Sequence, residues 1–415
     1  MGQDSRRPVT ILVEALRWRR HHRLALLGAL AVVTAACTSA GGGITTVAPA
    51  VDAPSTTHAP LTTTSEPAPS TSVAAGRSGE LQSFVEDWSV ANDPVGVAAA
   101  VLFPDGELWL GAAGLADRET ALAVAPTDRF EIASITKTFM ATLTLRLVEE
   151  AVIDLDDPIA GFLPDFPAAD EITVRMLLGH RAGIFDPTPI LVTDQFGPPD
   201  PNKVFTPEEL LTATAAETPT YPPGSRHEYT NAGYWVLAAV LETATGTDTA
   251  SLLDAYVTGP MGLADTLLFD ASLPEVEVVN AYKDLDLDGD EDPMGTAPLP
   301  GLVTPAWTAG GMISTAADLV TFLDGLFAGN LLTEASLDEM TDTANGGGTY
   351  AMGIYQSSGR WGHDGGIAGY LSAVFHDTGT GVTVAVLTNR FGPDAPQADA
   401  LAPRLAAVAN QLADS

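Results

Sequence analysis

Apolar, strand-like segments lie near both ends of this chain, and they restrict its fold more than any other feature. Two are joined by Pro104-Asp105-Gly106, and two by Thr378-Gly379-Thr380-Gly381. Such pairs on either side of a Gly-containing turn are typical of β-hairpins. The four strands are predicted at residues 95–103, 107–110, 370–375 and 382–387. Helical segments at residues 81–88 and 397–412 flank them, so sheet from both ends brackets a largely helical middle.

Composition agrees with one large folded domain, which we place at residues 80–415. Hydrophobic residues make up 46% of the 415 residues, enough for a substantial core. The formal net charge is −34 at pH 7. A surface of that sign repels phosphates, so no nucleic-acid partner is expected.

The N-terminus has the pattern of an export signal. Arginines at positions 17, 19, 20 and 23 precede an apolar run at residues 24–36, which is short for a membrane span. Cys37, the single cysteine, follows this run as in a bacterial lipoprotein cleavage site. Residues 1–37 are therefore predicted to form a signal peptide that leads to an exported, lipid-anchored protein at the cell membrane. An ordinary signal-peptidase site remains the alternative, and the export route stays open.

The segment that follows, residues 38–79, is rich in Thr, Ser, Pro and Ala and has almost no aromatic residues. It cannot bury enough apolar surface to offset the entropy lost on ordering, so we expect a disordered tether.

Three short motifs indicate the chemistry. Ser134 and Lys137 are three apart at the start of a predicted helix, after residues 130–133, which read as a buried strand or turn. Side chains three apart share a helix face, so the lysine amine can take the serine proton. Tyr229-Thr230-Asn231 and His363-Asp364-Gly365 follow in that order. Each motif alone is weak, but their order and context together favour a serine acyl-transfer enzyme.

From about residue 81 to the C-terminus, the chain resembles the penicillin-recognising serine hydrolases: class C β-lactamases, D-alanyl-D-alanine carboxypeptidases and related esterases. Further blocks that carry the resemblance lie at residues 177–184, 221–224 and 309–315. The resemblance implies an α/β (α+β) fold of the β-lactamase/transpeptidase type. In it, an antiparallel sheet from both chain ends is flanked by helices and interrupted by an α-rich region, with the active site between them.

The resemblance also implies roles for the motif residues. Ser134 is the nucleophile, Lys137 and Tyr229 transfer its proton, Asn231 holds a substrate amide, and His363 replaces the lysine of the β-lactamases. Free lysine and tyrosine have pKa values of about 10 and are protonated at neutral pH. We expect a nearby cation to depress the pKa of Lys137 and an ammonium to favour the tyrosinate of Tyr229. Which of the two is the base is left open.

Backbone N–H groups of Ser134 and Gly366 would form the oxyanion hole, next to Gly365. Asp364 departs from the family pattern, because a threonine usually stands there and helps to hold a substrate carboxylate. An anionic side chain repels a carboxylate, which argues against a penicillin-like or free D-Ala-D-Ala terminus. Any carboxylate clamp would come from elsewhere, with Arg181, Arg226 and Arg360 as candidates.

The predicted substrate is therefore an ester or amide acyl donor, small or peptide-derived. A D-alanyl-D-alanine carboxypeptidase, or a penicillin-binding cell-wall sensor that deacylates slowly, is the alternative. No cofactor or catalytic metal is expected, and oligomeric state is not predicted. The acidic run at residues 284–292 matches the opening of a calcium loop, but Gly295 stands where an EF-hand has its closing Glu. A solvated acidic loop and a looser calcium site both remain open.

Overall fold

A computed structural model describes residues 71–191, 200, 202–270, 276–284, 291–367, 369–392, 395 and 397–413. The predicted signal peptide, Cys37 and most of the predicted tether lie outside these residues. So do residues 285–290, the centre of the acidic run.

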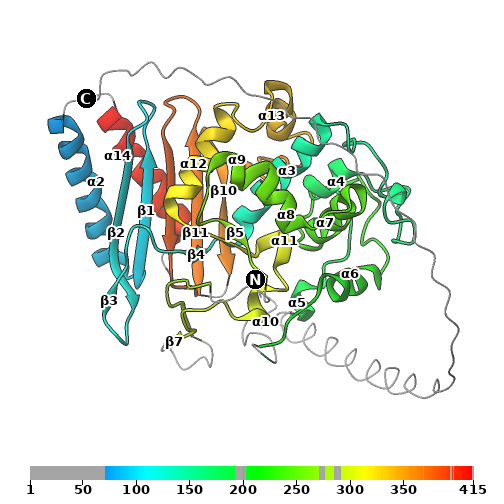
Figure 1. Cartoon of the computed structure of the whole chain (residues 1–415), viewed down its shortest axis with the longest axis horizontal. Helices are drawn as coiled ribbons and strands as arrows, with labels where there is room; N and C mark the ends of the chain where they lie inside the picture. Colours follow the sequence, from blue (N-terminus) through cyan, green and yellow to red (C-terminus); the bar gives the residue numbers. More distant parts are fainter. Residues whose placement is uncertain are drawn as a thin grey trace, which may run out of the picture. The chain divides into compact units, whose positions relative to one another are not determined.

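The domain is organised around a seven-stranded antiparallel sheet that combines strands from both ends of the chain (Figure 1). Both predicted hairpins are present, and they meet because β1 pairs with β12. The order of the strands across the sheet is β3 (Leu122–Ala123), β2 (Leu108–Asp117), β1 (Gly96–Leu102), β12 (Thr383–Thr388), β11 (Tyr370–Asp377), β10 (Arg360–Ile367) and β9 (Tyr355–Ser357). The predicted fold class is confirmed.

Helices cover both faces of this sheet, which explains why its central strands are apolar throughout. In β1, Val97, Ala99 and Val101 pack under the terminal helices α2 (Thr71–Asn92) and α14 (Ala398–Ala413). The alternate residues Ala98 and Ala100 face the main core on the side of α12 (Ala316–Phe327). Since successive strand side chains point to opposite faces, a strand buried on both sides has no polar alternation.

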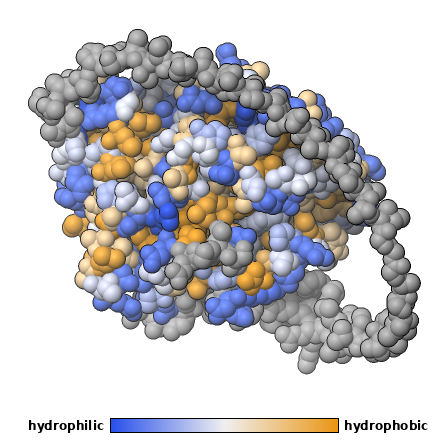
Figure 2. Space-filling view, viewed as in Figure 1, coloured by the Kyte–Doolittle hydropathy of each residue, from blue (hydrophilic) through white to orange (hydrophobic). Residues whose placement is uncertain are grey.

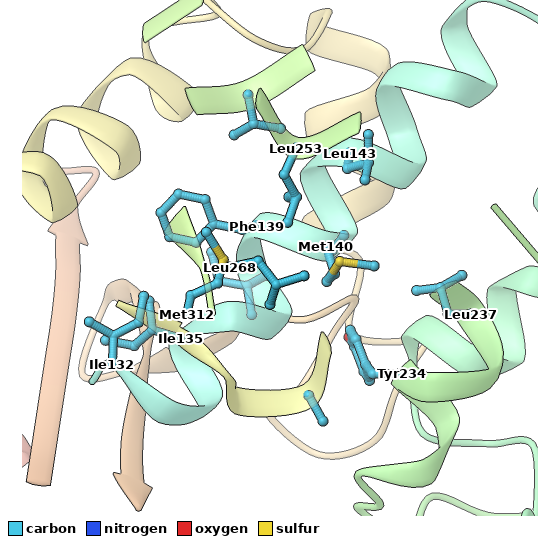
Figure 3. Close-up of a cluster of buried hydrophobic side chains, with 14 of the residues drawn as sticks. Ile132, Ile135, Phe139, Met140, Leu143, Tyr234, Leu237, Leu253, Leu268 and Met312 are labelled. Atoms are coloured by element: carbon cyan, nitrogen blue, oxygen red, sulfur yellow. The ribbon is translucent and has the colours of Figure 1, made fainter. Parts of the chain in front are cut away.

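Apart from α12, most helices between residues 133 and 341 lie beside the sheet (Figure 1). The helix α3 (Thr136–Glu149) runs through the main core, where it contributes Phe139, Met140 and Leu143 to a cluster of apolar side chains (Figure 3). Phe139 stacks on Phe322, with the ring centroids 3.7 Å apart. The remaining elements are η1 (Ala133–Ile135), η2 (Ile159–Gly161), α4 (Val174–Leu178), α5 (Thr188–Leu191), α6 (Pro207–Ala215), α7 (Ala232–Thr245), α8 (Thr249–Leu253), η3 (Asp254–Thr258), α9 (Gly259–Met261), α10 (Pro300–Val303), α11 (Trp307–Gly310) and α13 (Glu334–Thr341).

Two small sheets complete the domain. β4 (Phe130–Glu131) and β5 (Leu267–Leu268) pair with either side of β8 (Met312–Ser314). β6 (Tyr282–Lys283) pairs with β7 (Asp292–Pro293). The first of these sheets leads directly into η1 and so fixes where the nucleophile motif begins.

One local expectation needs correction. The helix α2 begins at Thr71, so residues 71–79 are helical rather than part of the tether. Arg77 stabilises this extension, because its guanidinium pairs with Asp105 and Glu107 in the turn of the first hairpin.

The start of α12 has only part of a capping box. Thr315 caps Asp318, but the Asp318 carboxylate accepts bonds from Asp265 and Thr266 instead of completing the box.

Hydrophilic and apolar residues are interspersed over the face shown in Figure 2. Within the described ranges, none of the helices combines the length and apolar character that a bilayer span needs.

Candidate active site

Ser134 lies at the junction between the small sheet and the helix α3. Strand β4 ends at Glu131, and the short η1 turn then delivers Ser134 to the start of α3, as the sequence predicted. Ala133 adopts a left-handed backbone with φ of +48°. Non-glycine residues in this region store strain that the surrounding structure must hold. Here Ser372 contributes, because its hydroxyl donates a hydrogen bond to the carbonyl of Ile132, 2.8 Å away.

The Lys137 side chain is fully buried one turn into the helix, with Nζ 3.2 Å from Ser134 Oγ. The same nitrogen lies 2.9 Å from Asn231 Oδ1 and 2.7 Å from the carbonyl oxygen of Ala309. A neutral amine has two N–H groups and one lone pair. Donation to Asn231 and Ala309 uses both N–H groups, and the lone pair then faces the Ser134 hydroxyl.

Burial lowers the pKa of Lys137 to about 7, while the nearby Asp186 and Asp364 act in the opposite direction. The mechanism expected from the sequence was therefore wrong, because desolvation rather than a second cation depresses this pKa. At neutral pH a large fraction of Lys137 is in the basic form.

Tyr229 lies beside both residues. Its ring centroid is 4.7 Å from Lys137 Nζ, and its hydroxyl is near enough to Ser134 for that neighbour to lower the Tyr229 pKa. The residue as a whole is 42% exposed, although its hydroxyl is desolvated by burial. Burial raises the pKa of Tyr229 well above its usual value, and Asp364 and Asp186 add to the rise. The expectation that an ammonium favours the tyrosinate is therefore also wrong: Tyr229 is a neutral phenol that can donate a proton.

Asp186, a residue that the motifs did not identify, binds the backbone of Asn231. Asp186 Oδ2 accepts the Asn231 backbone N–H at 2.7 Å, and its other oxygen accepts the Thr188 N–H at 2.9 Å. The Asn231 side chain thus has a fixed position from which it accepts a bond from Lys137. The only sequence signal for Asp186 is its place just after the 177–184 block.

His363 is near these groups, but both of its ring nitrogens are directed to partners other than Ser134. Its Nδ1 lies 2.5 Å from the carbonyl oxygen of Asp364, and its Nε2 lies 3.1 Å from the Tyr350 hydroxyl. The same hydroxyl is 3.1 Å from Nε2 of His180, whose Nδ1 accepts the N–H of Thr230. Burial lowers the pKa of His363 to about 4, so the imidazole is neutral at pH 7.

Gly365 and Gly366 bring strand β10 against the nucleophile turn. A Cβ on Gly365 would lie 2.4 Å from the Ile132 carbonyl oxygen and 2.5 Å from Ser372 Oγ. Only glycine allows this approach without displacing backbone. Gly366 and Ser134 line the same two cavities, and an oxyanion hole formed by their two N–H groups stays a prediction.

Ser134 lies between two cavities. One, of about 270 Å³, also has Asn231, Ala309, Gly366 and Phe391 in its wall. The other is more open, about 400 Å³, and its aromatic wall is made by Tyr229, Tyr350 and Tyr355. Asp364 belongs to this second cavity, where its Oδ1 accepts a bond from the Tyr355 hydroxyl at 2.7 Å. An acyl donor bound across Ser134 can therefore place one part in each cavity.

The three arginines suggested as a carboxylate clamp bind other groups of the protein. Arg181 donates to the carbonyl oxygens of Gly346 and Gly224. Arg226 pairs with Glu228, and Arg360 pairs with Asp377. None of the three is among the described residues around either cavity. In the part of the chain that the structure describes, no three His, Cys, Asp or Glu side chains gather as a metal site would require.

A buried lysine with a lowered pKa, a serine and a neutral tyrosine lie close together, and these are the groups that a serine acyl-transfer hydrolase uses. A model of the beta-lactamase family matches residues 85–409, and the chain belongs to that family.

Relatives in this family differ in their activities. Penicillin-binding protein 4 of Amycolatopsis lactamdurans is 29% identical over 325 residues, which cover 70% of this chain and 80% of the relative. Esterase EstB of Burkholderia gladioli is 35% identical over 180 residues, 40% of this chain and 46% of the esterase. The crystal structure of D-amino acid amidase from Ochrobactrum anthropi SV3 superposes with a TM-score of 0.68 at 26% identity, over 82% of this chain and 98% of the amidase. The protein is a serine hydrolase that acts on esters or amides through an acyl-enzyme.

Proposed function

We propose that this hydrolase cleaves esters or amides whose departing group carries no free carboxylate. The observation that carries the proposal is the placement of Asp364 in the same cavity as Ser134 and Tyr229. The group that leaves must receive a proton, so it lies on the side of the phenol donor. A carboxylate on that group would lie in the same cavity as the Asp364 carboxylate, and two like charges in one cavity repel each other.

The roles of the remaining residues follow from their chemistry. Neutral Lys137 removes the Ser134 proton, and Oγ forms a bond to the substrate carbonyl carbon. The N–H groups of Ser134 and Gly366 stabilise the oxyanion. As the bond to the leaving group breaks, Tyr229 donates its proton to that group and regains one from the Lys137 ammonium. Water then repeats the sequence to release the acid, while Asn231 holds the acyl portion on the other side.

The names of two relatives support this choice. One is an esterase and the other a D-amino acid amidase, so the family includes proteins named for ester and amide substrates. The similarity to a penicillin-binding protein favours a second candidate, a carboxypeptidase or a slowly deacylating penicillin-binding sensor.

Intact-mass measurement of the protein separates these candidates. It would be mixed in turn with a fluorophosphonate, a penicillin and a short-chain aryl ester, in parallel with Ser134→Ala. We expect a fluorophosphonate adduct and ester turnover in the wild type, neither in Ser134→Ala, and no penicillin adduct. A stable penicillin adduct on Ser134 would replace the proposal with the second candidate. Labelling retained in Ser134→Ala would remove Ser134 as the nucleophile.

We also infer that the exported chain is attached to the membrane by a lipid on Cys37. Its position directly after the apolar run supports this, as does the absence of any other cysteine in the sequence. Radiolabelled palmitate should be incorporated into the wild type and not into Cys37→Ser when each is expressed in a bacterium with lipoprotein processing. Equal incorporation, or none in either, would contradict the anchor.

A further inference from the structure

The second cavity has two properties beyond its position beside Ser134. Its wall carries three phenol rings, and Asp364 carries the charge among the side chains that the structure describes around it. The pKa of His363 is lowered to about 4, so this ring adds no positive charge at pH 7. The cavity is therefore aromatic and negative.

The rings are arranged closely enough to enclose a small group. The centroids of Tyr229 and Tyr350 are 5.7 Å apart with the ring planes nearly perpendicular, and those of Tyr350 and Tyr355 are 6.4 Å apart. Tyr355 connects the aromatic wall with the negative charge of Asp364, because its hydroxyl donates a hydrogen bond to Asp364 Oδ1. Aromatic faces next to a carboxylate are the usual surroundings of an ammonium group in proteins, since the ring quadrupole attracts a cation.

From these observations we propose that the second cavity is a leaving-group subsite for a cation, so that the preferred substrates are esters or amides with an ammonium-bearing leaving group. This inference rests on the proposed function and adds the class of substrate to it. In the acylation step the bond between the carbonyl carbon and the leaving oxygen or nitrogen breaks, the new bond to Ser134 Oγ forms, and Tyr229 supplies the proton to the departing atom. The ammonium stays bonded to the leaving group and takes no part in proton transfer.

The test compares three esters with the same acyl group and leaving alcohols of similar shape. Butyrylcholine carries a cation, 3,3-dimethylbutyl butyrate is its neutral counterpart, and 3-carboxypropyl butyrate carries an anion. Each kcat/KM is divided by the rate constant for hydroxide hydrolysis, which corrects for intrinsic reactivity. The wild type should prefer the cationic ester over the neutral ester by about five- to fiftyfold, with the anionic ester last. The preference should shrink as salt is added.

Asp364→Asn is the decisive variant, because the amide oxygen can still accept the Tyr355 hydrogen bond while the charge is lost. Its preference for the cationic ester should fall to within about twofold of unity. Asp364→Thr should improve turnover of the anionic ester. Glu334→Gln on the exposed first turn of α13 removes one negative charge from a distant surface and should leave the preference unchanged. A wild-type preference of one or less, or one that persists in Asp364→Asn, would overturn the proposal.

A binding measurement covers the case in which none of the three esters is turned over. Choline should protect Ser134 from fluorophosphonate labelling at lower concentration than 3,3-dimethylbutan-1-ol, and this difference should vanish in Asp364→Asn. Equal protection in the wild type would contradict the cation subsite. Failure of the proposed function has a different signature, since Ser134 would then form a stable penicillin adduct whichever alcohol protects it better.

Discussion

Tyr350 and His363 are joined by a hydrogen bond of 3.1 Å between the phenol oxygen and the imidazole Nε2. The direction of this bond follows from its neighbours. His180 accepts a backbone N–H at Nδ1, so its proton is on Nε2 and is donated to the Tyr350 oxygen. Tyr350 then donates its own proton to His363, which carries its remaining proton on Nδ1 toward the Asp364 carbonyl. Both nitrogens of His363 are therefore occupied.

Loss of the Tyr350 hydroxyl should make His363 easier to protonate. In Tyr350→Phe the lone pair on Nε2 loses its donor, so the pKa of His363 should rise from about 4 toward the ordinary value for histidine. An NMR titration of the histidine side chains in wild type and variant measures this directly. Tyr355→Phe, which removes a hydroxyl bonded to Asp364 instead, is the matched control and should leave the His363 titration much closer to wild type. An unchanged His363 pKa in Tyr350→Phe would contradict the assigned direction.

The lowered pKa of Lys137 predicts how the acylation rate depends on pH. Its pKa is lowered to about 7, and only the neutral amine can accept the Ser134 proton, so kcat/KM should rise with pH through a midpoint near 7. Lys137→Met and Lys137→Arg should both reduce kcat/KM by roughly 10³-fold or more, because the first has no base and the guanidinium of the second stays protonated. Steady-state kinetics from pH 5 to 9 checks both points. Substantial activity in Lys137→Arg would assign the base elsewhere.

The two neighbouring glycines in β10 should respond differently to substitution. In Gly365→Ala the new methyl group would meet the Ile132 carbonyl oxygen at 2.4 Å and the Ala133 Cβ at 2.9 Å, so the nucleophile turn must move. We expect a loss of about 1–3 kcal/mol in unfolding free energy and most of the activity. In Gly366→Ala the nearest atom, 3.0 Å away, belongs to the Phe391 ring, which can shift. Urea unfolding and ester turnover compare the pair, and equal effects would show that the close contact at Gly365 does not position Ser134.

Glu131 should make the domain less stable as the pH rises from about 5 to 8. This β4 side chain is 4% exposed, and burial raises its pKa from 4.5 to about 8. Below pH 4.5 it is protonated in both the folded and the unfolded state. Between the two pKa values the unfolded state ionises while the folded state stays neutral, so the unfolding free energy falls. Glu131→Gln should remove much of this decline in urea unfolding curves, and a decline of the same size in the variant would contradict the assignment.

The local patterns were sufficient to predict the two hairpins, the terminal helices and the motif residues gathered around Ser134. Hairpins and the start of α3 depend on neighbours in sequence, which is why they could be predicted. Asp186, Tyr350 and Tyr355 were missed, because none of them belongs to a short motif and the contacts that bring them to the site form only in the folded chain. The pKa values of Lys137 and Tyr229 were misjudged for a related reason: burial decides them, and the depth of a side chain is a property of the assembled fold.

The position of β12 between β1 and β11 has a consequence for how the chain folds. The first and last hairpins of the sheet become one surface only when β12 joins them, and Asn389 then accepts a bond from the Gly96 N–H across 293 residues of chain. Contacts of this sequence separation are slow to form. A ribosome must therefore release nearly the whole polypeptide before the two halves can unite, and a product that stops before Thr383 would have no strand to join them.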